Sequence, residues 1–478
     1  MLWLLLLNLL VKPFWILGIE VGVQNAVGSE AYGLYFAVFN LSYVFNIVLD
    51  LGITNYNTRN IARYPALIDK HLSGILGIKI MLLVLYLVIT FGVGLLLGYG
   101  SVQFRLLAWL CLNQFLSSLI LYLRSNFEGL LMFKWDSLLS VLDRVLMIVI
   151  CGLLLWAPRF SNPDSQFSIF HFVYAQTAAY IATASIALTI LIRKVGLKRL
   201  RFNRMFTLAV LKQSLPFALL VLLMACYNRL DPVMLQRLSP HGTGNYNAGI
   251  YAGAFRLLDA LTMVAYLVSI PLLPVFSKMT KAYNPMELRD TVRHIFSLMT
   301  VFAVTAACAL SSLDTELMNL FYVDHVTDYA RVFHVLIFCI IPISTTYVFG
   351  TLLTAAGKLR QLNILAFITL LLNVAVNLFC IPRWGAVGSA YAALAAQSFM
   401  ALAQVATALR TFSILPTRGY ILKILFFALC IVACTFCTPH LAWWIALPVV
   451  TLLAIGIAWV LGLLEIKEIL SNWKLNGK

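Results

Sequence analysis

About fourteen apolar stretches, each close to the length of a membrane span, follow one another along this chain with short connections. A hydrocarbon core about 30 Å thick requires about 20 apolar residues per helix. Hydrophobic residues make up 62% of the chain and charged residues 11%, so the bilayer must be its solvent. The sequence therefore predicts an all-α polytopic membrane protein. The expected spans are 2–24, 33–52, 75–97, 104–123, 137–157, 168–192, 213–236, 248–276, 292–313, 330–355, 361–382, 385–409, 419–438 and 442–464.

The basic residues are unevenly distributed between the two ends of these spans. With a cytoplasmic N-terminus and one crossing per span, inner segments and adjoining span ends hold 24 of the 34 Lys and Arg residues. The outer counterparts hold five, namely Arg105, Arg159, Arg237, Arg331 and Arg383. This bias satisfies the positive-inside rule and places both termini in the cytoplasm. The net charge of +16 therefore reflects the orientation of the spans and contact with anionic membrane lipid. We expect no nucleic-acid partner.

Two parts of the chain resemble each other. Tyr32–Phe39 opens the second span and Ala248–Phe255 opens the eighth, with Gly, Tyr and Phe in the same register 216 residues apart. A six-helix unit has an even number of crossings, so its copy has the same orientation. This pattern predicts two pseudo-symmetric lobes related by an axis along the membrane normal. Chance similarity between apolar segments is the alternative.

The expected domains follow from this repeat. Residues 1–200 form an N-terminal six-helix lobe, 201–412 a C-terminal six-helix lobe, and 413–478 two extra helices and a cytoplasmic tail. The longest inner connection, 193–212, is strongly basic with interleaved apolar residues. It is either a linker or a segment lying on anionic lipid. Because Met1 lies directly in an apolar run, we expect a retained first helix and no signal peptide.

No motif indicates an enzyme. Cys434 and Cys437 form a CxxC without a second ligand pair, and the seven histidines do not cluster. Gly350–Lys358 has six residues between its glycines and Leu359 after the lysine, which does not fit a phosphate-binding loop. We therefore expect a transporter with no catalytic residue, no metal and no cofactor.

Charged residues inside spans are costly and usually face protein or a water-filled cavity. The candidate substrate-binding residues are the basic ones, namely Lys12, Arg144, Arg229 and Arg256. The candidate coupling or orienting residues are the acidic ones, namely Glu20, Asp143, Asp231 and Asp259. Lys79, near the inner end of the third span, is expected to extend to the membrane interface.

Each candidate also has a structural interpretation. Pro13 is expected to kink the first span beside Lys12, either at a cavity or near the interface. Asp143 and Arg144 are adjacent, so their side chains point about 100° apart and do not pair optimally. The i,i+3 spacing of Arg256 and Asp259 allows either a structural pair or an anion-binding arginine held by a carboxylate. Pro232 indicates a broken or ending helix, so Arg229 and Asp231, like Glu20, mark either an outer gate or an interfacial helix end.

Several segments resemble polysaccharide or O-antigen (Wzx-type) flippases of the MOP exporter superfamily. The similarity lies in Leu9–Glu20, Tyr32–Tyr35, Leu49–Asn55, Arg59–Ala62, Asp231–Leu235 and Gly249–Tyr251, and the layout of the whole chain agrees. The resemblance implies two six-helix lobes around a V-shaped cavity in a bacterial inner membrane.

The same resemblance implies a substrate and partners. The substrate would be an undecaprenyl-pyrophosphate-linked oligosaccharide, moved to the outer leaflet by alternating access for surface polysaccharide biosynthesis. Lys12, Arg144 and Arg256 would contact the pyrophosphate, and other polysaccharide-assembly membrane proteins would be partners. Two alternatives stay open: a MATE-like cation-coupled drug antiporter, which requires a more acidic cavity, and a glycan polymerase or ligase, which the short outer loops disfavour.

Overall fold

The structure is a computed structural model that describes residues 11, 13–54, 57–58, 61, 68–161, 167–195, 218–282, 285–412, 418–436 and 443–464. Three features singled out in the sequence lie outside these residues: Lys12, the basic connection beyond residue 195, and Cys437. Every regular element in the described part is a helix, which confirms the predicted class.

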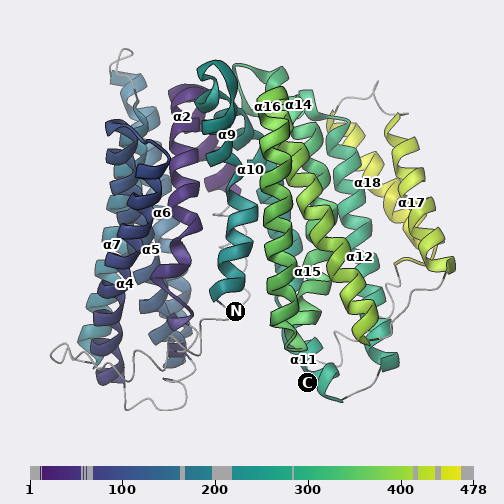
Figure 1. The fold of residues 1–478 in the computed structure, drawn as a ribbon, viewed down its shortest axis with the longest axis horizontal. Helices are drawn as coiled ribbons and strands as arrows, with labels where there is room; N and C mark the ends of the chain where they lie inside the picture. The colour runs from purple at the N-terminus through teal and green to yellow at the C-terminus, as the bar shows by residue number, and fades with distance from the viewer. Residues whose placement is uncertain are drawn as a thin grey trace. The chain divides into compact units, whose positions relative to one another are not determined.

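The helices of the first half of the chain are the π-helix η1 (Trp15–Glu20), α2 (Val21–Val44), η2 (Asn46–Leu49), α4 (Ile68–Leu96), α5 (Ser101–Gly129), α6 (Phe133–Ser161), α7 (Ile169–Val195), α9 (Asp231–Leu238) and η4 (Pro240–Gly242) (Figure 1). They are followed by α10 (Gly244–Ser269), α11 (Leu272–Ala282), α12 (Pro285–Ser311), α13 (Asp314–Phe321), α14 (Val326–Leu336), η5 (Ile337–Cys339), α15 (Ile340–Ala355), α16 (Leu359–Phe412), α17 (Arg418–Phe436) and α18 (Trp443–Val460).

Ten helices within the described ranges are long and apolar enough to cross a membrane. A bent pair, Ala218–Arg229 and Asp231–Leu238, forms an eleventh candidate with a 45° angle. The break immediately precedes Pro232, as the sequence predicted. Proline lacks an N–H and clashes with the preceding turn, so it ends or bends the helix that precedes it.

The longest element, α16, is two spans joined by a sharp reversal. Its 54 residues would measure about 81 Å if straight, far more than the hydrocarbon core. Gly385 has φ 52° and ψ −128°, outside helical geometry. Beyond it Gly388 packs against the carbonyl of Cys380, and Thr369 lies 3.5 Å from the Met400 sulfur. The two antiparallel arms match the expected spans at 361–382 and 385–409.

The chain divides into two compact units, residues 1–252 and 253–478. In unit 1, α2 packs on α5, α7 and α9, and α4, α6 and α7 also contact α5 (Figure 1). Gly28, with φ 81°, breaks α2 near its start. The chain reverses there, because Trp15 before the break and Tyr35 after it both contact Phe172 of α7.

A close contact between repeated glycines lies inside unit 1. A Cβ atom at Gly33 of α2 would overlap the carbonyl oxygen of Asn245, and one at Gly249 of α10 would overlap the carbonyl oxygen of Ser29. Each pair maps onto the other under the 216-residue offset of the sequence repeat. The matching glycines therefore allow two equivalent helix starts to touch backbone to backbone.

In unit 2, α12 is the helix on which both extra C-terminal helices pack. Ser297 of α12 hydrogen-bonds the Tyr420 hydroxyl of α17 at 2.8 Å, and Arg293 lies over the Tyr420 ring. Phe427 and Ala458 complete a buried apolar cluster among α12, α17 and α18. These contacts attach the helices that the sequence placed outside the repeat.

Large apolar side chains are exposed along the outward faces of the spans. Val88 is 65% exposed, Leu402 70% and Leu425 61%. Soluble monomers rarely expose such continuous apolar surface, whereas lipid chains solvate it at no cost. The chain is therefore a multi-pass membrane protein.

Candidate functional site

A π-helical turn begins two residues after Pro13 and places Trp15 beside Glu20. The Trp15 indole nitrogen donates a 3.0 Å hydrogen bond to the Glu20 carboxylate five residues later. A π-helix has i→i+5 periodicity, so it brings these residues to one face, which an α-helix does not. Such turns occur frequently at functional sites. The kink expected at Pro13 stays a prediction, and the irregularity that the structure shows after it is this π-helix.

Arg144 of α6 lies at the centre of a polar cluster in unit 1. Its guanidinium lies 5.7 Å from the centre of the Trp15 ring, and its Nε is 3.8 Å from the Asp143 carboxylate. The charge of Arg144 also interacts with Tyr180, Glu20 and Tyr35. We call these six residues, Trp15, Glu20, Tyr35, Asp143, Arg144 and Tyr180, the Arg144 cluster.

Aromatic rings hold the Arg144 cluster in place from the side of α7. The Phe172 ring stacks on Trp15 at 5.8 Å and meets Tyr35 edge to face at 5.3 Å. Gln176, one turn further along α7, donates a 3.2 Å hydrogen bond to the Tyr35 hydroxyl. Trp15 and Tyr35 are buried, and the Arg144 side chain is 33% exposed. The aromatic frame is therefore packed against a partly buried arginine.

The adjacent pair Asp143 and Arg144 behaves as its sequence spacing predicted. The two side chains approach only to 3.8 Å, and Asp143 accepts a 2.8 Å bond from the backbone N–H of Arg144 instead. A long contact of this kind leaves the guanidinium donors open to a better acceptor.

Arg229 and Asp231 also belong to unit 1. The Arg229 guanidinium lies 5.3 Å from the ring centre of Tyr43 in α2. Asp231 begins α9, is 2% exposed and accepts a 3.0 Å hydrogen bond from Tyr251. Arg229 therefore contacts α2, and Asp231 has a buried structural contact.

Arg256 and Asp259 lie in the part of α10 that belongs to unit 2. Arg256 is 4% exposed and donates a 2.9 Å hydrogen bond to the Tyr322 hydroxyl. Tyr322 in turn stacks on Tyr329 at 4.1 Å, and that ring lies against Gly253. Asp259 is half-buried one turn further along the helix. A role for either residue in binding substrate stays a prediction.

The prediction for Lys79 is wrong. Its ammonium does not extend to the interface but is buried, with the side chain 1% exposed. It donates to the Asp50 carboxylate and the Leu49 carbonyl, each at 2.9 Å, and to the Ser118 hydroxyl at 2.8 Å. Embedded partners satisfy all three ammonium protons, so the long side chain has no reason to extend to water.

Sequence reasoning thus placed Glu20, Asp143 and Arg144 in spans but did not predict that they meet. It missed the aromatic frame of Trp15, Tyr35 and Phe172 altogether. The one available signal was Trp15 beside Lys12-Pro13, because an aromatic residue next to a kinked charged segment suits a cation contact.

Arg144 in this cluster can exchange one anionic partner for another. The Asp143 carboxylate contacts the guanidinium only at long range, and a guanidinium is a group that can bind phosphate oxygens in a bidentate manner. Within the described ranges, no group of three or more His, Cys, Asp or Glu residues is placed to hold a metal ion. The cluster can therefore bind or release an anion by exchanging the partners of Arg144.

Solved structures with the same fold are membrane transporters. The lipid II flippase MurJ in an inward closed conformation matches with a TM-score of 0.72 at 14% identity, covering 96% of this chain and 98% of that one. A multidrug resistance MATE family transporter of the MOP superfamily, inward-facing, matches with a TM-score of 0.65 at 14% identity over 83% and 94%. A MOP superfamily transporter from Pyrococcus furiosus matches with a TM-score of 0.60 at 15% identity over 86% and 94%.

These likenesses show that the chain has the fold of MOP-superfamily transporters, since identities this low carry no more than the fold. No curated protein sequence matches the chain. A family model, described as polysaccharide biosynthesis protein, matches residues 1–280, which include every member of the Arg144 cluster. The chain therefore belongs to the polysaccharide biosynthesis protein family.

Proposed function

We propose that this protein moves undecaprenyl-pyrophosphate-linked oligosaccharide from the cytoplasmic to the outer leaflet of the bacterial inner membrane, for surface polysaccharide biosynthesis. The observation that carries the proposal is Arg144, an arginine inside a membrane-spanning helix with its guanidinium beside the Asp143 carboxylate and the Trp15 ring. The family and the fold shared with a lipid II flippase support the same substrate class.

Moving a pyrophosphate-linked oligosaccharide across the membrane requires polar protein groups such as a guanidinium along the path. The pyrophosphate and the sugar hydroxyls cannot cross hydrocarbon unaided, because each unpaired polar group costs several kcal/mol there. A protein-lined path substitutes fixed donors for water while the lipid tail stays in the bilayer. One guanidinium supplies several donors in a planar fork that matches phosphate oxygens.

The Arg144 cluster can exchange one anionic partner of Arg144 for another. The Asp143 carboxylate lies 3.8 Å from the Arg144 Nε, and a pyrophosphate that binds the guanidinium would take the place of this long contact. Arg229, Lys12 and Arg256 remain predicted contacts for other stages of alternating access.

Neutralising Arg144 tests the proposal. We expect Arg144→Gln to lower translocation at least about tenfold, equivalent to about 1.4 kcal/mol, because a charge-assisted bidentate contact is lost. The measurement is complementation of a deletion strain, scored as lipid-linked oligosaccharide on each face of the inner membrane. The matched control is Arg105→Gln, which removes an exposed arginine lying 4.6 Å from the ring of Phe170 and should leave translocation unchanged.

The deletion strain itself decides between transporter classes. Complete lipid-linked units confined to the cytoplasmic face would support the flippase and identify its cargo. A normal distribution of these lipids together with altered resistance to cationic drugs would reject it in favour of a cation-coupled drug antiporter.

A further inference from the structure

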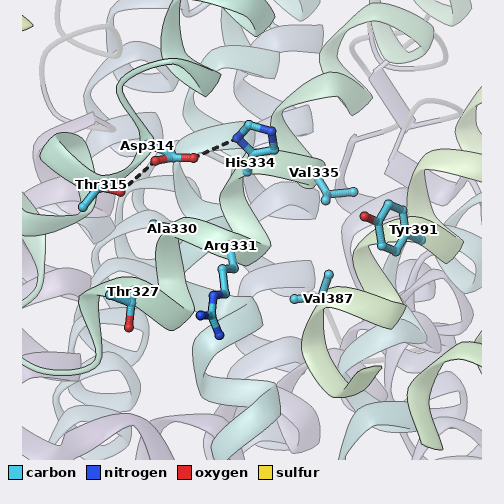
Figure 2. A pocket seen from close by; sticks show the side chains of 9 residues that line it. All are labelled: Asp314, Thr315, Thr327, Ala330, Arg331, His334, Val335, Val387 and Tyr391. Carbon is cyan, nitrogen blue, oxygen red and sulfur yellow. Dashed lines mark hydrogen bonds and ion pairs between the residues drawn. The ribbon is translucent and has the colours of Figure 1, made fainter. Parts of the chain in front are cut away.

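A second polar site lies in unit 2, far along the sequence from the Arg144 cluster. Three helices line an open cavity of about 400 Å³ at the protein surface: α13, α14 and the second arm of α16 (Figure 2). This volume falls in the range of small-molecule sites, about 300–1,000 Å³. The positive-inside topology places this end of unit 2 outside, because it lies in the connection after the ninth predicted span.

An ordered set of hydrogen-bonding groups lines one side of the cavity. His334 Nδ1 lies 2.8 Å from the Asp314 carboxylate and 3.1 Å from the Ser311 hydroxyl. Because both contacts use Nδ1, the ring orientation is fixed and the Nε2 edge faces away from Asp314. Thr315 donates a 2.9 Å bond to the same carboxylate (Figure 2). The side chain of His334 is 56% exposed, so this ordered group is accessible.

An aromatic ring faces these groups from the other side of the cavity. Tyr391 of α16 is 47% exposed and directs its hydroxyl toward α14 (Figure 2). The Trp384 ring meets it edge to face at 6.2 Å. Aromatic residues are enriched at membrane interfaces, which is a sufficient reason for Trp384, because Trp384 does not line the cavity. Tyr391 has a further role, because its ring forms one wall of the cavity.

The charges around the cavity indicate the class of ligand. Arg331 is 75% exposed, and its guanidinium lies 3.9 Å from the Asp328 carboxylate, while the Asp314 carboxylate also lines the cavity. A phosphate site gathers cations and excludes carboxylates, so this lining disfavours a phosphate. Acceptors, donors and an apolar ring together suit a ligand with hydroxyls on its edge and C–H groups on its face. Such a ligand is a sugar.

We propose that this cavity binds the glycan portion of the transported molecule at the outer end of unit 2. The inference rests on the proposed function, because it assigns an exit subsite to the same cargo. Tyr391 packs against the face of a pyranose ring, while His334, Arg331 and the Asp314 carboxylate bond its hydroxyls. A sugar held here after crossing would be kept from returning with the pyrophosphate.

Binding of free glycan to the full-length protein in lipid nanodiscs tests the proposal. The probe is the oligosaccharide released by mild acid from the lipid-linked pool of the host, and the readout is saturation-transfer NMR with titration. We expect Tyr391→Ala and His334→Gln each to weaken binding about tenfold. Tyr174→Ala is the matched control, since Tyr174 is 42% exposed but belongs to α7 of unit 1.

The controls separate the two proposals. Arg144→Gln should bind the free glycan normally even though it fails in translocation. A Tyr391-dependent interaction in a protein whose deletion leaves lipid-linked sugars normally distributed would reject the flippase and retain the glycan site. Wild-type affinity in both Tyr391→Ala and His334→Gln, no binding by the wild type, or displacement by inorganic pyrophosphate would each overturn the glycan site.

Discussion

Gly33→Ala is expected to lower the free energy of unfolding by about 3 kcal/mol or more, at the upper end of the cost of overpacking. The added methyl would overlap the carbonyl oxygen of Asn245 and approach the backbone nitrogen of Gly249 to 2.5 Å. Both obstacles are backbone atoms of one helix, so no side-chain rotation relieves them. The helix starts must separate, which also strains the 2.9 Å bond from Gln24 to the Gly249 carbonyl. Denaturant titration in detergent micelles measures the loss.

A matched glycine isolates this effect from helix propensity. A Cβ atom at Gly92, in α4, would meet nothing within 4 Å. Gly92→Ala should therefore be neutral or stabilise the protein by up to about 1 kcal/mol, because alanine is the better helix former. Gly249→Ala should resemble Gly33→Ala, and the double variant should cost less than their sum, since one separation of the helices relieves both clashes. Equal stabilities of Gly33→Ala and Gly92→Ala would contradict the backbone contact.

This glycine contact shows what the sequence was able to predict. The repeated Gly-Tyr-Phe register identified Gly33 and Gly249 as equivalent because a repeat preserves local packing requirements. The breaks before Pro232 and near Gly385 were predictable for a similar reason, since backbone geometry at proline and glycine is a local property. Span existence follows from hydropathy alone.

The Arg144 cluster was less predictable because its contacts depend on local irregularity and distant packing. Glu20 reaches Trp15 only through a π-helical turn, and no residue pattern encodes that turn unambiguously. The rings of Tyr35 and Phe172 come from α2 and α7, more than a hundred residues apart. The cavity at His334 likewise requires the short helices α13 and α14. Hydropathy leaves α13 in a connection and joins α14 to the following span.

The buried position of Lys79 was also unpredictable from the sequence, because its partners are distant along the chain. A lone lysine near a span end is ordinarily expected to extend to the interface, and nothing local contradicts this. Its partners Asp50 and Ser118 lie 29 and 39 residues away. Only the packing of α4 against α5 and the end of η2 brings the three together.

Asp50→Ala is expected to be the most destabilising single substitution considered, by about 3–5 kcal/mol in the free energy of unfolding. It leaves the ammonium of Lys79 buried without its counter-charge, held only by the Leu49 carbonyl and the Ser118 hydroxyl. Lys79→Met should cost less. The carboxylate that it leaves behind is 24% exposed and keeps the hydroxyl of Thr54 as a donor.

The double variant Asp50→Ala/Lys79→Met distinguishes an uncompensated charge from a simple loss of packing. Replacing a whole buried ion pair by apolar groups is often neutral, because both desolvation costs disappear with the attraction. We therefore expect the double variant to recover most of the stability lost in Asp50→Ala, measured by the same denaturant titration. Additive losses would mean that the two residues act independently. Recovery of stability with loss of translocation would instead assign the pair a role in transport, since a membrane protein retains costly embedded charge mainly where function requires it.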